Sequence, residues 1–201
     1  MEAAIPPLFL ALSMENNIEI ISECHISNNR IIVDGKLLFE LDNVAFQEFS
    51  KQALRHLEVI YPKFFKMDNL SKLAFLGAEI LLKDREIPSD TALVFANRSS
   101  SLDTDVQYSK SIADKTDYYP SPAVFVYTLP NICLGEISIR HQLKSENSFF
   151  IFDAFNRGFL TNYAAALIQA KKASQVLCGW TEYFQGEYTA ALFLVKAKPT
   201  K

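Results

Sequence analysis

Alternating and helical spacings of apolar residues predict a mixture of strands and helices along the whole chain. Residues 18–22 alternate between apolar and polar side chains, which predicts a strand. Residues 30–39 predict two short strands joined at Asp34-Gly35, a pair suited to the positive φ angles of a type I′ turn. We therefore expect a short hairpin near the start of the chain.

Helical spacing is clearest in three segments. Apolar residues recur with helical period over residues 44–59 and again over residues 70–81, where Asp68 or Asn69 is suited to cap the helix. Residues 158–171 are apolar around nearly the whole circumference of the expected helix. A helix of that kind is normally buried between layers.

Short apolar runs predict the remaining strands. Such runs cover residues 91–96, 148–152, 175–180 and 188–195. The stretch 119–130 contains several prolines and is expected to be loop and extended chain. The order is α/β throughout, and no linker or repeat divides residues 1–201, so we expect a single domain.

Composition narrows the possible partners. The 201 residues are 49% hydrophobic, which is enough for a buried core, and the formal net charge is −3 with scattered Lys and Arg. Nucleic acid is therefore not an expected partner. No apolar run approaches the roughly 20 residues of a membrane-spanning helix.

Residues 3–12 form an apolar opening that invites interpretation as a signal peptide. The segment lacks a basic region before it, carries Pro6 and Pro7, and ends without a clear small-residue cleavage site. We therefore expect a cytoplasmic protein.

The cysteines and histidines form no recognisable metal or disulfide motif. An odd number of cysteines without C-x-x-C spacing favours reduced thiols, and no two histidines lie close enough to share a helical face. No metal and no cofactor is expected. The residues concerned are Cys24, Cys133, Cys178, His25, His56 and His141.

Several segments between residues 67 and 196 resemble, in the same order, the N-terminal half of β-ketoacyl synthases. The run KMDNLSKLA from Lys66 resembles the family's R-M-D-R-F-S-x-x-A helix start. The run LPN from Leu129, with the glycine, arginine and asparagine that follow, is similar to M-P-N-x-x-x-G-x-x-A-I-R-x-x-L-x-G-P-N. The run VLCGWTE from Val176 is similar to V-x-x-A-G-G-T-E. The motif positions carried over are Pro130, Asn131, Gly135, Arg140, Asn147, Gly179 and Glu182.

The resemblance implies half of a thiolase-like fold. It implies a mixed sheet of about five strands packed with helices, in addition to the short N-terminal hairpin. The family's activity is that of a 3-oxoacyl-acyl-carrier-protein synthase. This chain departs from the family pattern in the parts that carry that activity.

The family's nucleophile is a cysteine in N-x-x-x-S-x-A-C-x-x-G, at a helix N-terminus that stabilises the thiolate. Counting from Asn147 to Gly179 without gaps places Ala154 at that cysteine, flanked by Asp153 and Phe155. Alanine cannot form a thioester. The family's two histidines belong to a C-terminal half that has no counterpart here, and the family's long insertion is missing after Glu182.

Other residues were weighed as substitutes for the nucleophile. Cys133 and Cys178 fall where a small buried residue is the ordinary choice, with no cation or helix terminus nearby to lower the thiol pKa. Asp103 and Asp105 could suggest a metal site or a triad, but a capped helix start explains them better. Asp153 could act as a general base, although we expect it to cap the helix after the turn.

Aromatic residues near the vacated position could line an acyl pocket, and core packing explains them at least as well. They are Phe150, Phe152, Phe155 and Phe159.

Half of a thiolase-like fold should expose an apolar face that its relatives bury. The resemblance therefore implies a homodimer or a heterodimer with an intact ketosynthase, with acyl carrier protein as a further possible partner. The expected function is a non-catalytic partner subunit in fatty-acid, polyketide or aryl-polyene-type biosynthesis. Two alternatives stay open: an active acyltransferase with an unrecognised nucleophile, and a stand-alone module that binds acyl chains or carrier protein.

Overall fold

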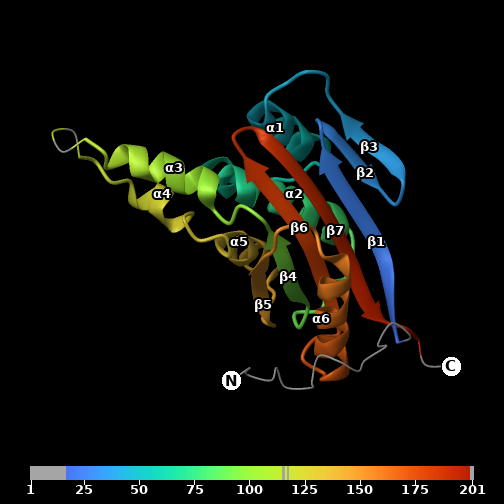
Figure 1. Cartoon of the computed structure of the whole chain (residues 1–201). Helices are drawn as coiled ribbons and strands as arrows, with labels where there is room; N and C mark the ends of the chain where they lie inside the picture. The colour runs from blue at the N-terminus through green and yellow to red at the C-terminus, as the bar shows by residue number, and fades with distance from the viewer. Residues whose placement is uncertain (1–16, 115, 117, 200–201) are drawn as a thin grey trace, which may run out of the picture.

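The computed structural model in Figure 1 describes residues 17–114, 116 and 118–199. The segment 3–12, considered above as a signal peptide, lies outside the described residues. The strands are β1 (Ile18–Ser27), β2 (Arg30–Val33), β3 (Lys36–Glu40), β4 (Ala92–Asn97), β5 (Asn147–Ile151), β6 (Gln175–Phe184) and β7 (Glu187–Ala197). The helices are α1 (Phe46–His56), a 3₁₀ helix η3 (Pro62–Lys66), α2 (Asn69–Leu82), α3 (Leu102–Ser111), α4 (Pro122–Val126), α5 (Ile132–His141) and α6 (Arg157–Gln169).

The strands form one mixed sheet in the order β3-β2-β1-β7-β6-β4-β5. β4 pairs in parallel with β5 and β6, and the other neighbours are antiparallel. The mixed α/β architecture expected from the sequence is confirmed. The sheet has seven strands rather than about five, because the N-terminal hairpin joins it through β1 instead of standing apart.

The turn between β2 and β3 has the geometry that the sequence predicts. Asp34 and Gly35 have φ angles of 49° and 78°, both in the left-handed region. Glycine tolerates that region without steric cost, and aspartate tolerates it better than most residues. The pair therefore fixes the register of the hairpin.

Helices cover the two faces of the sheet unequally. α2 packs on β1, β6 and β7, with α1 and α5 beside it, and these elements enclose the larger hydrophobic core. α6 lies on the opposite face against β4, β6 and β7 (Figure 1). The second, smaller core lies between α6 and the sheet.

α2 begins where the sequence predicts. The Asp68 carboxylate accepts the Ser71 backbone N–H at 2.9 Å, which caps the helix. Its other oxygen accepts the Thr104 hydroxyl at 2.9 Å. One side chain therefore starts α2 and ties α3 to it.

α6 differs from the expectation that it is buried on all sides. Its inner side is buried at Leu160, Ala164 and Leu167, but Asn162 and Ala166 on the outer side are exposed. Among the described residues, no second layer lies outside α6. Apolar residues around a whole helix predicted burial on all sides, and the described residues supply it on the inner side alone.

The stretch 119–130 was expected to be loop and extended chain, and that expectation is wrong. It contains α4, which packs on α3 in an arm that extends away from the sheet (Figure 1). The Ser121 hydroxyl accepts the Val124 N–H at 3.3 Å, and Pro122 occupies the first turn, where it needs no hydrogen-bond donor. Of the three prolines in the stretch, Pro120 precedes the capped helix, Pro122 begins it and Pro130 follows it.

Candidate functional site

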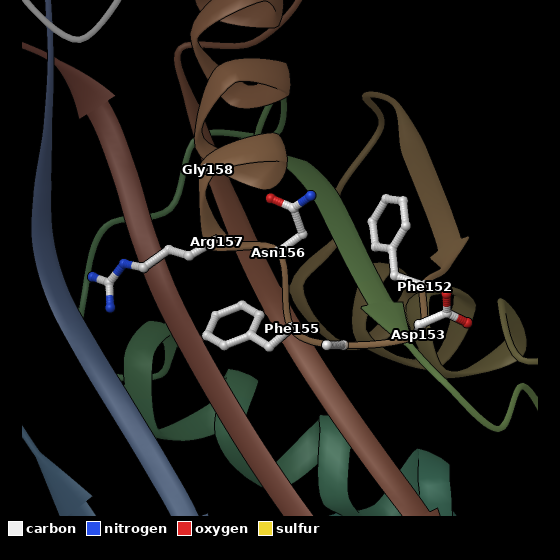
Figure 2. A pocket seen from close by; sticks show the side chains of 7 residues that line it. Phe152, Asp153, Phe155, Asn156, Arg157 and Gly158 are labelled. Carbon is white, nitrogen blue, oxygen red and sulfur yellow. The ribbon is translucent and has the colours of Figure 1, made fainter.

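Ala154, which the sequence resemblance aligns with the family's nucleophile, lies in the turn that connects β5 to α6. Ala154 is exposed there, as are Asp153 and Phe155. Figure 2 shows the Asp153 carboxylate turned away from Arg157, while Phe155 points across the sheet surface. No thiol lines this turn.

Asn156 caps α6, whereas the sequence led us to expect Asp153 in that role. The Asn156 side-chain oxygen accepts the Phe159 N–H at 2.9 Å, three residues into the helix. Asp153 lies three residues before the cap and cannot reach the first turn. Ala154 and Phe155 separate Asp153 from the capping position, and the helix begins at Arg157, one residue earlier than predicted.

An open cavity of about 590 Å³ lies over this turn. Residues 152–158 line it, so the aromatic walls come from Phe152 and Phe155. The backbone of the first turn of α6 also borders the cavity, where the helix dipole favours negative charge.

The aromatic residues considered for an acyl pocket separate into two groups. Phe150, Phe152 and Phe159 lie together, with ring centroids 4.9 Å apart for Phe150 and Phe159 and 5.0 Å apart for Phe152 and Phe159. All three pack against the smaller core. Phe155 lies apart from them, with its ring 5.9 Å from Trp180. Packing accounts for the first group, and the acyl pocket stays a prediction.

The cysteines lie inside the protein, away from the turn. Cys24, Cys133 and Cys178 have no exposed surface. Burial raises the pKa of Cys24 to about 12, with a smaller contribution from Asp34, and it raises the pKa of the other two thiols well above the ordinary value. A thiol held protonated in the core is a poor nucleophile.

The Asp103 and Asp105 pair lies in the first turn of α3, where negative charge complements the helix dipole. Asp103 accepts the Gln185 N–H at 3.0 Å, and Asp105 lies 3.3 Å from the Ser101 hydroxyl. Among the described residues, no group of three or more His, Cys, Asp or Glu side chains could hold a metal ion. A helix start therefore accounts for both carboxylates.

Two of the family-motif residues have structural roles that the geometry explains. Glu182 accepts the backbone N–H groups of Arg98 and Ser99 at 2.7 and 3.2 Å, so it holds the loop after β4. A Cβ at Gly179 would lie 3.0 Å from Phe95 and 3.1 Å from Leu192, so glycine permits the close packing there.

The other motif residues lie around α5 and β5. Asn131 precedes α5, and Asn147 at the start of β5 donates to the Ser138 hydroxyl at 3.2 Å. The Pro130 carbonyl accepts a hydrogen bond from the Cys133 thiol, with 3.1 Å between oxygen and sulfur. Gly135 has no atom near the position of a Cβ, so nothing in the packing requires glycine there.

Sequence reasoning missed Arg157, which anchors α6 to the sheet. Its guanidinium donates to Glu23 on β1 at 2.8 Å and lies 4.8 Å from the centre of the Phe193 ring on β7. The three residues are far apart in sequence, and no local motif signals their contact.

Comparisons with known proteins show the fold of the chain. Neither a family model nor a curated protein sequence matches it. The ishigamide ketosynthase/chain length factor structure is similar with a TM-score of 0.69 and 17% identity, over 90% of this chain and 62% of that one. The ketosynthase ApeO in complex with its chain length factor ApeC, from Xenorhabdus doucetiae, is similar with a TM-score of 0.60 and 18% identity. The match covers 90% of this chain and 79% of that one.

A third similar structure is AntDE:AntF, described as a type II PKS acyl-carrier protein in complex with its ketosynthase. It gives a TM-score of 0.67 and 14% identity, over 90% of this chain and 62% of that one. The chain thus spans 62% of the length of two of these three structures. None of the described helices is long and apolar enough to cross a membrane. The chain has the thiolase-like fold of ketosynthases and chain length factors.

Proposed function

We propose that this chain is a non-catalytic, β-ketoacyl synthase-like subunit that pairs with an intact ketosynthase in fatty-acid, polyketide or aryl-polyene-type biosynthesis. The observation that carries the proposal is the exposed Ala154 in the turn between β5 and α6. The family places its nucleophile at that position, and the thiols of this chain are buried elsewhere. Two of the similar structures are of a ketosynthase together with a chain length factor.

The free edge of β5 supports the pairing. Among the described strands, β4 is its one neighbour in the sheet. The Glu146 carbonyl and the Phe152 N–H, at the two ends of β5, form their hydrogen bonds with β4. Because alternate residues of a strand bond to the same neighbour, Phe149 and Ile151 direct their backbone groups to the free edge. An unpaired edge of this kind can accept a strand from a partner.

Exposed apolar side chains concentrate on the arm and on α5, which packs beside β5. The sequence led us to expect an exposed apolar face without placing it, and most of the large exposed apolar residues lie here. A partner that reached from the β5 edge to the arm would bury them and gain roughly 25 cal/mol per Å² of apolar surface, before the costs of association. The residues are Leu102, Val106, Tyr118, Tyr119, Phe125, Val126, Leu129 and Ile139.

Purification from the native host tests the pairing. We expect a stoichiometric complex with a cysteine-containing ketosynthase, with acyl carrier protein as a further component of the pathway. Ile151→Lys places a charge on the β5 edge and should abolish the complex without unfolding the protein, since Ile151 is 51% exposed.

The matched control is Leu37→Lys on β3 at the opposite edge of the sheet, where Leu37 is 48% exposed. It should leave the complex intact. A chain that purifies as a homodimer or alone, or a complex that survives Ile151→Lys, would contradict the proposal.

A further inference from the structure

Gly135 lies at the centre of the outer face of α5. The helix packs on α2 through its inner face, where Cys133 and Ile137 are fully buried. Successive residues of an α-helix are about 100° apart, so Gly135 lies about 200° around the helix from both of them. It therefore faces away from the core, on the side of α5 that borders the surroundings of β5 (Figure 1).

The fold of the chain gives no reason for a glycine at this position. A Cβ at Gly135 would have none of the described atoms within 4 Å. Its φ angle is not among the positive ones, so the backbone conformation suits any residue. Glycine in a helix interior destabilises the helix relative to alanine. The same helix ends at Gln142 with a φ of 56°, which is where a glycine would help.

The neighbours of Gly135 on the outer face make a shallow hole around it. Residues three and four positions away share a helix face, and here they include Ile132, Ser138 and Ile139. Ile139 is 65% exposed and forms an apolar wall. On the other side, Ser138 accepts a hydrogen bond from Asn147 at 3.2 Å, so this wall borders the start of β5. The bare backbone of α5 is therefore the floor of a hole beside the β5 edge.

The chemistry of the hole favours an apolar occupant. The helix uses its own backbone hydrogen-bonding groups at Gly135, so the floor offers nothing to a charged or polar group. The charged side chains of α5 are held elsewhere, since Glu136 contacts Tyr127 and Lys63, and Arg140 contacts Glu79. A large apolar side chain seated here would cover the exposed side of Ile139 and approach the helix backbone closely.

We propose that the hole at Gly135 receives a large apolar side chain of the partner ketosynthase, as a knob fits a hole between packed helices. The inference rests on the proposed function, because the occupant belongs to the partner that pairs at the β5 edge. It adds a position that sets how closely that partner can approach. It also explains why α5 keeps a glycine that its own packing does not need.

Substitution of Gly135 should move folding and binding in opposite directions. The probe is the cysteine-containing ketosynthase that co-purifies with the chain, purified separately and titrated into the full chain by calorimetry. Gly135→Ala should make the free chain more resistant to urea, yet raise the dissociation constant of the complex by about tenfold or more through overpacking. Gly135→Leu fills the hole and should abolish the complex.

The matched control is Ala166→Leu, which adds a large side chain at an exposed position of α6 on the opposite face of the sheet. It should leave the dissociation constant unchanged, and circular dichroism verifies that each variant folds. A complex that is lost with Ile151→Lys but binds Gly135→Ala and Gly135→Leu as tightly as the unaltered chain would overturn this inference and leave the proposed function standing. The absence of any complex would overturn both.

Discussion

Arg140 at the end of α5 donates two hydrogen bonds to Glu79 on α2, at 3.0 and 3.3 Å. Glu79 is fully buried, and His141 Nε2 lies 2.8 Å from the same carboxylate. The Arg140 guanidinium also lies 5.4 Å from the centre of the Tyr61 ring. The Arg140–Glu79 pair therefore holds α5 against the core of the protein. It also holds in place the surface next to β5.

Replacing Glu79 should weaken this attachment. Glu79→Gln keeps the shape but leaves Arg140, whose side chain is 30% exposed, without its charge partner. We expect the free energy of unfolding to fall by about 1–3 kcal/mol, the range for hydrogen bonds to charged groups. Urea unfolding measures this change in free energy. The control is Arg30→Ala, which breaks an exposed ion pair with Glu40 and should have little effect on the free energy of unfolding. Equal effects of the two substitutions would contradict a structural role for Glu79.

The same carboxylate should make stability depend on pH. Burial raises the pKa of Glu79, but the contacts with His141 and Arg140 outweigh burial and hold the pKa below the ordinary value. A lowered pKa in the folded state stabilises the protein fully above the unfolded value of about 4.3, and this stabilisation is lost as the pH falls through the folded-state pKa.

The difference in unfolding free energy between the unaltered protein and Glu79→Gln should therefore shrink below about pH 4. Measuring the difference isolates Glu79 from Asp68, whose pKa burial raises and whose contribution has the opposite sign. A difference that is constant from pH 3 to pH 7 would contradict the pairing.

Gly179 and Gly135 should respond oppositely to alanine. A Cβ at Gly179 would meet Phe95 and Leu192 at 3.0–3.1 Å, so Gly179→Ala should cost about 1–3 kcal/mol through overpacking. Gly135 lies in α5 with open space around its Cβ position, so Gly135→Ala should stabilise the protein by up to about 1 kcal/mol. Thermal unfolding of the two variants checks the signs, and a neutral Gly179→Ala would show that β6 and β7 can shift apart.

The start of α6 should depend on Asn156 rather than on Asp153. Asn156→Ala removes the hydrogen bond to the Phe159 N–H and should cost about 0.5–2 kcal/mol. Asp153→Ala should leave unfolding unchanged, because that side chain lies outside the helix. The reverse order of the two effects would support the sequence-based expectation that the structure corrects.

Features encoded locally could be predicted from the sequence, because they depend on residues a few positions apart. The Asp34-Gly35 turn and the Asp68 cap are of this kind, as is the buried strand β4. The arm was missed because its prolines were taken as breakers, although Ser121 before Pro122 is itself a helix-start signal.

Features that depend on contacts between distant segments could not be predicted. Glu79 and Arg140 lie 61 residues apart, and Arg157 and Glu23 lie 134 apart. For the candidate site, the family motif located Ala154, while the division of the surrounding aromatics into packed and separate groups required the structure.

Intact-mass spectrometry of the chain and the proposed ketosynthase partner, after incubation with acyl and malonyl thioesters of acyl carrier protein, tests the central claim most directly. A non-catalytic subunit should keep its mass unchanged while the acyl group is bound to the partner ketosynthase's cysteine. A covalent acyl adduct on this chain, or condensation by this chain alone, would contradict the account.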